Sequence, residues 1–166
     1  YRISTIRTLV RFAPILRYTT NHDAHALRYW EMYSNSFSDL STRFPSLFTP
    51  TQLSQMAWSL YSLPMTWQAT SWGPRLVINL AKLINKSPSE FWQRDSVIRA
   101  VSSFRMMDST SKYTEAFIQA VSTKLLMCKS PFSLPNICTI MRDFAGCVRT
   151  SRRRKNWFAW SQTSVD

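Results

Sequence analysis

The stretch that decides the fold runs from Thr49 to Lys86 and reads TPTQLSQMAWSLYSLPMTWQATSWGPRLVINLAKLINK. Thr49 can cap a helix, Pro50 suits the first helical position, and Gln52 can complete a capping box. Apolar residues then recur at helical spacing, at Leu53, Met56, Leu60 and Leu63. After Pro64, a second stripe of the same period follows, at Leu76, Val77, Leu80, Leu83 and Ile84. The stretch therefore predicts two antiparallel helices, and each needs a neighbour to bury its stripe.

The residues after Lys86 read as a second, degenerate copy of this pair. Lys86-Ser87-Pro88 returns as Lys129-Ser130-Pro131, 43 residues later. The same offset matches Ala57 with Ala100, and Tyr61 with Phe104. Ser87-Pro88-Ser89-Glu90 resembles another capping box and predicts a helix start. Further apolar stripes follow at helical period, at Val97, Ala100, Val101, Phe104 and Met107, at Tyr113, Phe117, Val121 and Leu125, and at Ile137, Met141, Phe144 and Val148.

These patterns predict an all-α fold, a short α-solenoid of antiparallel helix pairs with degenerate repeats of roughly 40 residues. The helical-repeat domain is expected over residues 23–148. Residues 23–42, with Leu27, Trp30, Phe37 and Leu40 along one side, are expected to form the second helix of an incomplete leading repeat. The alternative is a non-repetitive helical bundle in which serine–proline caps recur by chance. In either case Leu60, Leu80, Phe104 and Phe117 are expected inside.

Both ends of the chain are basic. Residues 1–22 carry four arginines and no acid, which is typical of a basic arm or a transit-peptide remnant, and a plain N-terminal helix is the alternative. Residues 149–166 form a basic-aromatic tail, in which a run of four cations precedes Trp157 and Trp160. Such a tail can dock on RNA or fill a pocket of a partner protein.

Composition narrows the function classes. The formal net charge of +12 favours a polyanionic partner, nucleic acid before an anionic membrane. Two glycines cannot build a glycine-rich phosphate loop, and no paired carboxylates or nucleophile elbow occur, so we expect neither an enzyme nor a cofactor. No stretch is apolar enough to predict a membrane span. The three cysteines have neither zinc-ribbon nor disulfide spacing and are expected to be buried free thiols.

The candidate RNA-binding residues fall into three groups. Four residues line one polar face after Gly73, a cationic stripe without acids: Arg75, Asn79, Lys82 and Lys86. A second group flanks the next helical stripe: Arg94, Arg99 and Arg105. Small polar side chains on the same helix, Ser102 and Ser103, and on the matching helix of the first copy, Gln55, Ser59 and Ser62, could read unpaired bases. The third group is the tail, with Arg149, Arg152, Arg153, Arg154, Lys155, Trp157 and Trp160. For all three, an ordinary solvated surface is the alternative.

The segment Ala57-Trp58-Ser59-Leu60-Tyr61-Ser62-Leu63 resembles the first helix of octotricopeptide and heptatricopeptide repeats. It is also similar to repeats of FAST-kinase-like and RAP-domain proteins, whose first helices carry a Trp-Ala-x-Ala-x-Leu core. Trp58, Leu60 and Leu63 fit that core, Ser59 and Tyr61 replace its alanines, and the second copy has Val101 in place of the tryptophan. No RAP domain is visible. The resemblance implies organellar RNA binding.

The sequence therefore predicts an RNA-binding structural protein of the mitochondrial matrix. We expect a subunit of the mitochondrial ribosome that contacts rRNA and neighbouring protein subunits. The alternative is a scaffold without RNA, such as an accessory subunit of an inner-membrane respiratory complex, in which the positive charge would meet anionic lipid.

Overall fold

The structure is a computed structural model, and it describes residues 2–17, 24–64, 66–107 and 111–147. These residues contain helices and connecting turns but no strand, so the fold is all-α. In chain order the helices are α1 (Arg2–Arg17), α2 (Ala24–Arg43), α3 (Pro50–Ser59), α4 (Gly73–Lys86), α5 (Arg94–Val101) and α6 (Lys112–Leu126). Residues 134–147 form a further helix.

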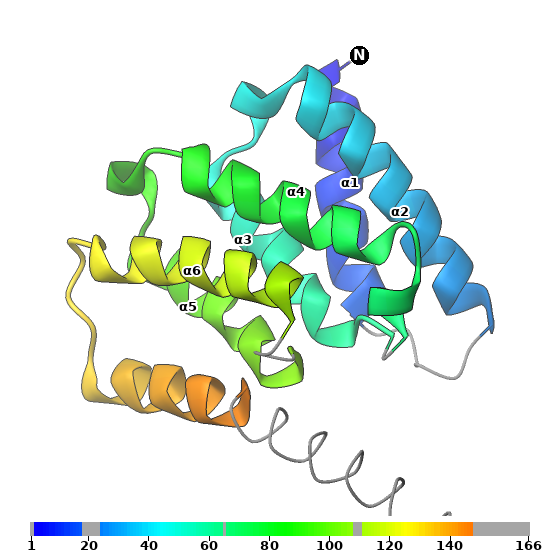
Figure 1. Ribbon diagram of the computed structural model, residues 1–166. Helices are drawn as coiled ribbons and strands as arrows, with labels where there is room; N and C mark the ends of the chain where they lie inside the picture. The colour runs from blue at the N-terminus through cyan, green and yellow to red at the C-terminus, as the bar shows by residue number, and fades with distance from the viewer. Residues whose placement is uncertain (1, 18–23, 65, 108–110, 148–166) are drawn as a thin grey trace, which may run out of the picture.

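The six labelled helices form two layers, an odd layer of α1, α3 and α5 and an even layer of α2, α4 and α6. In the odd layer α3 lies between α1 and α5, and in the even layer α4 lies between α2 and α6. Each odd helix also packs against the even helix that follows it. Figure 1 shows α4 and α6 side by side, with α3 and α5 behind them. The core lies between the layers because each helix turns its apolar stripe towards the other layer.

The predicted interior is confirmed. Leu60 and Leu80 are 1% exposed, and Phe104 and Phe117 are fully buried. The rings of Phe104 and Phe117 meet edge to face at 6.0 Å, joining α6 to the 3-10 turn η5 (Ser102–Met106) that continues α5. Burying such a side chain stabilises the fold by about 1.5–3 kcal/mol relative to leaving it exposed. The stripes of α3 and α4 are likewise buried over their whole length.

Residues Arg2–Arg17 do not project as an arm. They form α1, which packs against α2 and α3 and buries Ile6, Val10, Ala13 and Leu16. Residues 24–43 therefore have a first helix before them, where the sequence predicted an incomplete pair. Three alanines with no exposed surface mark the odd helices at spacings of 44 and 43 residues, at Ala13, Ala57 and Ala100. Alanine has the smallest side chain after glycine, so neighbouring odd helices can approach closely there.

The predicted helix starts hold only in part. Thr49 and Gln52 form the expected capping box, with each side chain bonded to the other's backbone N–H. The second predicted start, at Pro88, is wrong, because residues Ser89–Phe91 make a 3-10 turn and α5 begins at Arg94. The Ser87 hydroxyl cannot cap a helix there, since it donates to the Ile84 carbonyl and accepts from Trp92 Nε1 at 2.6 Å.

A buried lysine fastens this connection to α6. Lys124 is 3% exposed, and its Nζ donates to the carbonyls of Asn85 and Ser87, at 3.3 and 2.5 Å, and to Ser89 Oγ at 3.1 Å. Burial lowers the pKa of this amine. The two carbonyls lie at the C-terminal end of α4, where a cation is favoured by the helix dipole. One of the 21 cations of the chain thus has a structural role.

Some predicted core positions are exposed. Leu27 is 42% exposed on α2, and Ile137 and Met141 are 42% and 66% exposed on the helix over 134–147. That helix packs through other residues, since Phe144 lies 5.0 Å from Phe104 ring to ring and the Cys147 thiol donates to the Met107 carbonyl. The apolar side chains of this helix cover more of its surface than the side that packs against the rest of the protein, so some of them remain exposed to solvent.

The three thiols are free, as predicted, but only Cys147 is buried. Cys128 is partly exposed and contacts the Trp92 carbonyl at 3.7 Å, while Cys138 is exposed. The expectation of buried thiols is therefore wrong for Cys138. No helix in the described ranges is both long and apolar enough to cross a membrane.

Candidate nucleic-acid interface

The stripe on α4 is positioned by a close turn before it. A Cβ on Gly73 would collide with the Trp67 carbonyl oxygen and lie 2.9 Å from Thr70 Oγ1, so glycine is required there. The Gly73 N–H donates to Thr70 Oγ1 at 3.0 Å, which fixes the start of the helix. The helix then places four residues along one polar side, as the spacing predicted: Arg75, Asn79, Lys82 and Lys86.

The first half of this stripe contacts α2. Arg75 Nη2 donates to Asn35 Oδ1 at 2.5 Å, and Asn79 Nδ2 donates to Ser38 Oγ at 3.1 Å. Both bonds join neighbouring helices of the even layer. Asn79 is partly buried, so its amide holds two helices together and is a poor candidate for an RNA contact.

The second half of the stripe is exposed to solvent. Lys82 and Lys86 are both exposed, and Lys86 also lines a cavity of about 630 Å³ whose wall includes Phe91. Phe91 is 62% exposed and could stack on a base. However, Glu90 is exposed and adjacent to Phe91 in the chain, so this edge of the molecule also carries negative charge.

The second predicted group lies in the other layer. Arg94 pairs with Asp95 at 3.1 Å and donates to the Pro131 carbonyl at 3.5 Å. Arg99 is partly exposed on α5. Arg105 lies 3.6 Å from Asp143, on the helix over 134–147, and pairs with it. The groups on α4 and α5 therefore belong to different layers, and the structure does not bring them together.

A buried carboxylate on the helix over 134–147 contacts two arginines. Asp143 has 2% of its side chain exposed, while Arg105 and Arg142, at 3.6 and 3.5 Å, remain 44% and 61% exposed. Burial raises the pKa of Asp143, and the two guanidinium groups partly oppose that shift. One buried negative charge thus holds two partly exposed arginines at the surface, of which Arg142 was not among the predicted residues.

Two other predictions have different outcomes. Among the side chains expected to read bases, Ser59 and Ser103 are not accessible, because they are fully buried and donate to the carbonyls of Met56 and Ala100. Ser62 is also buried, whereas Gln55 and Ser102 are partly exposed. The predicted tail contacts lie outside the described residues, namely Arg149, Arg152, Arg153, Arg154, Lys155, Trp157 and Trp160.

Acids are distributed unevenly between the layers, a feature that was not predicted. Helices α1, α3 and α5 contain a single carboxylate, Asp95, and it is paired with Arg94. The even helices contain three, at Glu31, Asp39 and Glu115. Counting acids helix by helix would have revealed this difference, but only once the layers were known.

The odd layer also carries exposed cations and rings. Arg7 and Arg11 are exposed on α1, and Trp58 and Tyr61 are partly exposed on or just after α3. Within the described part of the chain, no three metal-binding side chains come together. The fold thus defines a class, an all-α protein of two helix layers, and its odd helices contain few acids. No family model matches the chain, and neither the curated proteins nor the solved structures contain a significant match.

Proposed function

We propose that this chain is an RNA-binding helical-repeat protein and that the surface of its odd layer contacts the RNA. The observation that carries the proposal is the scarcity of acids there: Asp95 is the one carboxylate in α1, α3 and α5, and its charge is offset by Arg94 at 3.1 Å. Exposed arginines on an acid-free helix, such as Arg7 and Arg11 on α1, attract phosphates because no neighbouring carboxylate on that helix offsets their charge. Trp58 and Tyr61 add aromatic rings of the kind that stack on bases.

The packing of the helices supports a repeat architecture. Odd helices contact odd helices, even helices contact even helices, and buried alanines recur on α1, α3 and α5. Ser59 and Ser102, 43 residues apart, each donate to the carbonyl three residues earlier, where their helices tighten into 3-10 turns. Such stacks present extended surfaces to partners. We propose that the protein serves as a structural subunit of an organellar ribonucleoprotein, with the mitochondrial ribosome as the first candidate.

The test compares the two layers at equal charge. The odd-layer variant carries Arg7→Gln and Arg99→Gln, and the matched even-layer variant carries Lys82→Gln and Lys86→Gln. Binding of a labelled single-stranded RNA is measured by fluorescence anisotropy across a salt series. The odd-layer variant should lower the slope of log affinity against log salt by about 0.7 for each phosphate that is no longer neutralised. An unchanged slope for this variant, or weaker binding only in the even-layer variant, would refute the proposed surface.

A second candidate function is a scaffold without RNA, such as an accessory subunit of a respiratory complex. It is favoured by large apolar side chains left in solvent on α1 and α2, including Ile15 at 57% and Met32 at 58%. Such side chains suit contacts with protein subunits. Sedimentation of the native protein with a large particle separates the two candidates, since only an RNA-dependent association disappears after RNase treatment.

A further inference from the structure

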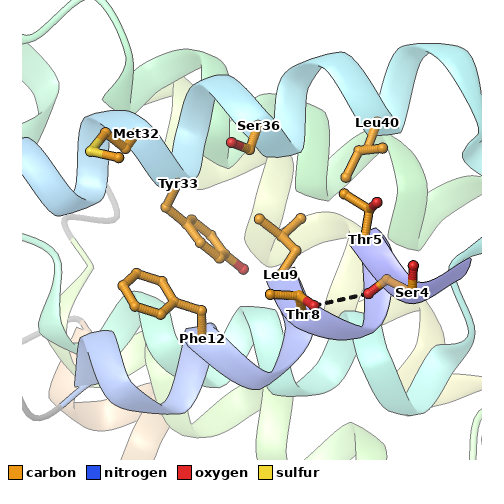
Figure 2. A pocket seen from close by; sticks show the side chains of 9 residues that line it. All are labelled: Ser4, Thr5, Thr8, Leu9, Phe12, Met32, Tyr33, Ser36 and Leu40. Atoms are coloured by element: carbon orange, nitrogen blue, oxygen red, sulfur yellow. Dashed lines mark hydrogen bonds between the residues drawn. The ribbon is translucent and has the colours of Figure 1, made fainter. Parts of the chain in front are cut away.

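An open groove runs between α1 and α2. It has a volume of about 460 Å³, and Figure 2 shows side chains from both helices around it. The α1 side consists of Ser4, Thr5, Thr8, Leu9 and Phe12, and the α2 side of Met32, Tyr33, Ser36 and Leu40. The other main contacts of these helices are with α3 and α4, so no further labelled helix covers this end of the two layers, at the edge of the molecule in Figure 1.

The groove exposes apolar side chains. Phe12 and Met32 are 36% and 58% exposed, and Tyr29 and Ile15 on the same two helices are 43% and 57% exposed. The end of a stack of helices is normally covered by a polar face or a capping element, because an apolar end would associate with other molecules. A cluster of large exposed side chains around a groove is typical of a protein-binding surface.

One buried polar atom lacks a partner here. The Tyr33 side chain is 3% exposed and points from α2 towards α1, and its hydroxyl has no hydrogen-bond partner among the residues that the structure describes. An unsatisfied buried hydroxyl is costly, so a bound molecule that supplies an acceptor recovers that energy. Burial also raises the pKa of Tyr33, which keeps the hydroxyl protonated and able to donate.

The shape and charge of the groove indicate its occupant. From Thr5 to Phe12 and from Tyr33 to Leu40 each wall advances about 10 Å along its helix, which matches two turns of a bound helix. On α1, Arg7 and Arg11 are exposed and the helix has no acid. On α2, two acids are balanced by two arginines, one of which, Arg43, lies 3.4 Å from Asp39. The surplus positive charge is therefore along the α1 edge.

We propose that this groove binds an acidic amphipathic helix of a partner protein, whose apolar stripe packs against Phe12 and Met32 and whose carboxylates face Arg7 and Arg11. An acceptor on that helix pairs with the Tyr33 hydroxyl. Helix-in-groove recognition uses apolar anchors at i, i+3 or i+4 and i+7, which fits a groove of two turns. A second copy of this chain is a poorer occupant, because the two basic α1 edges would repel each other. The proposal does not depend on RNA binding.

The test uses the full chain and two labelled synthetic peptides of about 18 residues, or five helical turns. Both carry the same leucine stripe, but one has glutamates and the other lysines at the remaining positions. Fluorescence anisotropy should show binding of the glutamate peptide and at least about tenfold weaker binding of the lysine peptide. Met32→Lys should weaken binding of the glutamate peptide about tenfold or more, since it places a polar group in the groove.

Two variants serve as controls. Leu126→Lys makes the same type of change at an 85% exposed residue of α6 and should leave binding unchanged. Tyr33→Phe should weaken peptide binding while leaving the free chain as stable as the wild type or more so, which a merely structural tyrosine would not do. Equal binding of both peptides, or binding that Met32→Lys leaves intact, would overturn the proposal. Two further results would overturn it. If Met32→Lys abolishes a dimer of the chain, a second copy is the occupant, and if it abolishes binding to anionic vesicles, a lipid surface is the occupant.

Discussion

The odd and even layers share one core but differ in how their helices meet. In the odd layer, Ala13, Ala57 and Ala100 are fully buried, and α3 and α5 continue into 3-10 turns that contact each other. In the even layer, α4 meets its neighbours through larger side chains, and surface hydrogen bonds from Arg75 and Asn79 join it to α2. The odd layer is thus held by close approach, and the even layer by bulkier packing and polar contacts.

The largest expected effect is in the even layer, where a large side chain fills the space between helices. Leu80 is 1% exposed on α4, so Leu80→Ala should lower the free energy of unfolding by about 2–5 kcal/mol, through reduced burial and the remaining cavity. Urea denaturation followed by circular dichroism measures the change. Lys82→Ala on the exposed side of the same helix is the control, and a destabilisation equal to that of Leu80→Ala would contradict the described core.

The odd layer should respond to the opposite change. Ala57 is fully buried on α3, between α1 and α5, so Ala57→Leu should lower the free energy of unfolding by about 1–3 kcal/mol because the added side chain separates the helices. Gln55→Leu adds an apolar side chain on the partly exposed side of α3 and should have little effect in the same denaturation experiment. If Ala57→Leu is stabilising, the odd helices are not in close contact.

A smaller effect is expected for the polar contacts of the even layer. The bond from Asn79 Nδ2 to Ser38 Oγ, at 3.1 Å, should contribute about 0.5–1.5 kcal/mol of coupling between α4 and α2. A double-mutant cycle with Asn79→Ala and Ser38→Ala measures this coupling from unfolding curves. Additive effects of the two substitutions would show that the bond does not join the helices in solution.

The smallest effect is a pH dependence from Asp143, a buried carboxylate on the helix over 134–147 that pairs with Arg105 beside the odd layer. Burial raises the pKa of Asp143 in the folded chain, so the native state binds more protons than the unfolded state just above the ordinary aspartate pKa. The free energy of unfolding attributable to this group therefore falls as pH rises through that window. Asp143→Asn should gain stability relative to the wild type between about pH 4 and pH 7.

Urea denaturation at the two pH values measures this difference. Asp95→Asn, at a side chain that is 77% exposed, is the matched control. A difference between Asp143→Asn and the wild type that stays constant with pH would show that ion pairing with Arg105 and Arg142, at 3.6 and 3.5 Å, cancels the effect of burial, and a wild type that gains on the variant as pH rises would show that pairing outweighs it.

The sequence by itself determined the class of fold and much of the core. Apolar residues at helical period identified the stripes of α3, α4 and α5, because burial of one helix face leaves its period in the sequence. The Thr49–Gln52 capping box was also readable, since all its groups lie within four residues. The helix start that was wrongly predicted at Pro88 had the same local pattern. There the Trp92 Nε1–H donates to the Ser87 hydroxyl, and this competing hydrogen bond is not visible in the sequence.

Only the tertiary structure decided how the surfaces are arranged. The stripe on α4 was visible in the sequence, but its first half bonds to Asn35 and Ser38, at separations of 40 and 41 residues along the chain. The surface of the odd layer and the groove between α1 and α2 combine residues from helices that are separate in sequence. The period of apolar residues predicts which face of a helix is buried. It does not predict which helix packs against that face, because that depends on contacts between residues far apart in the sequence.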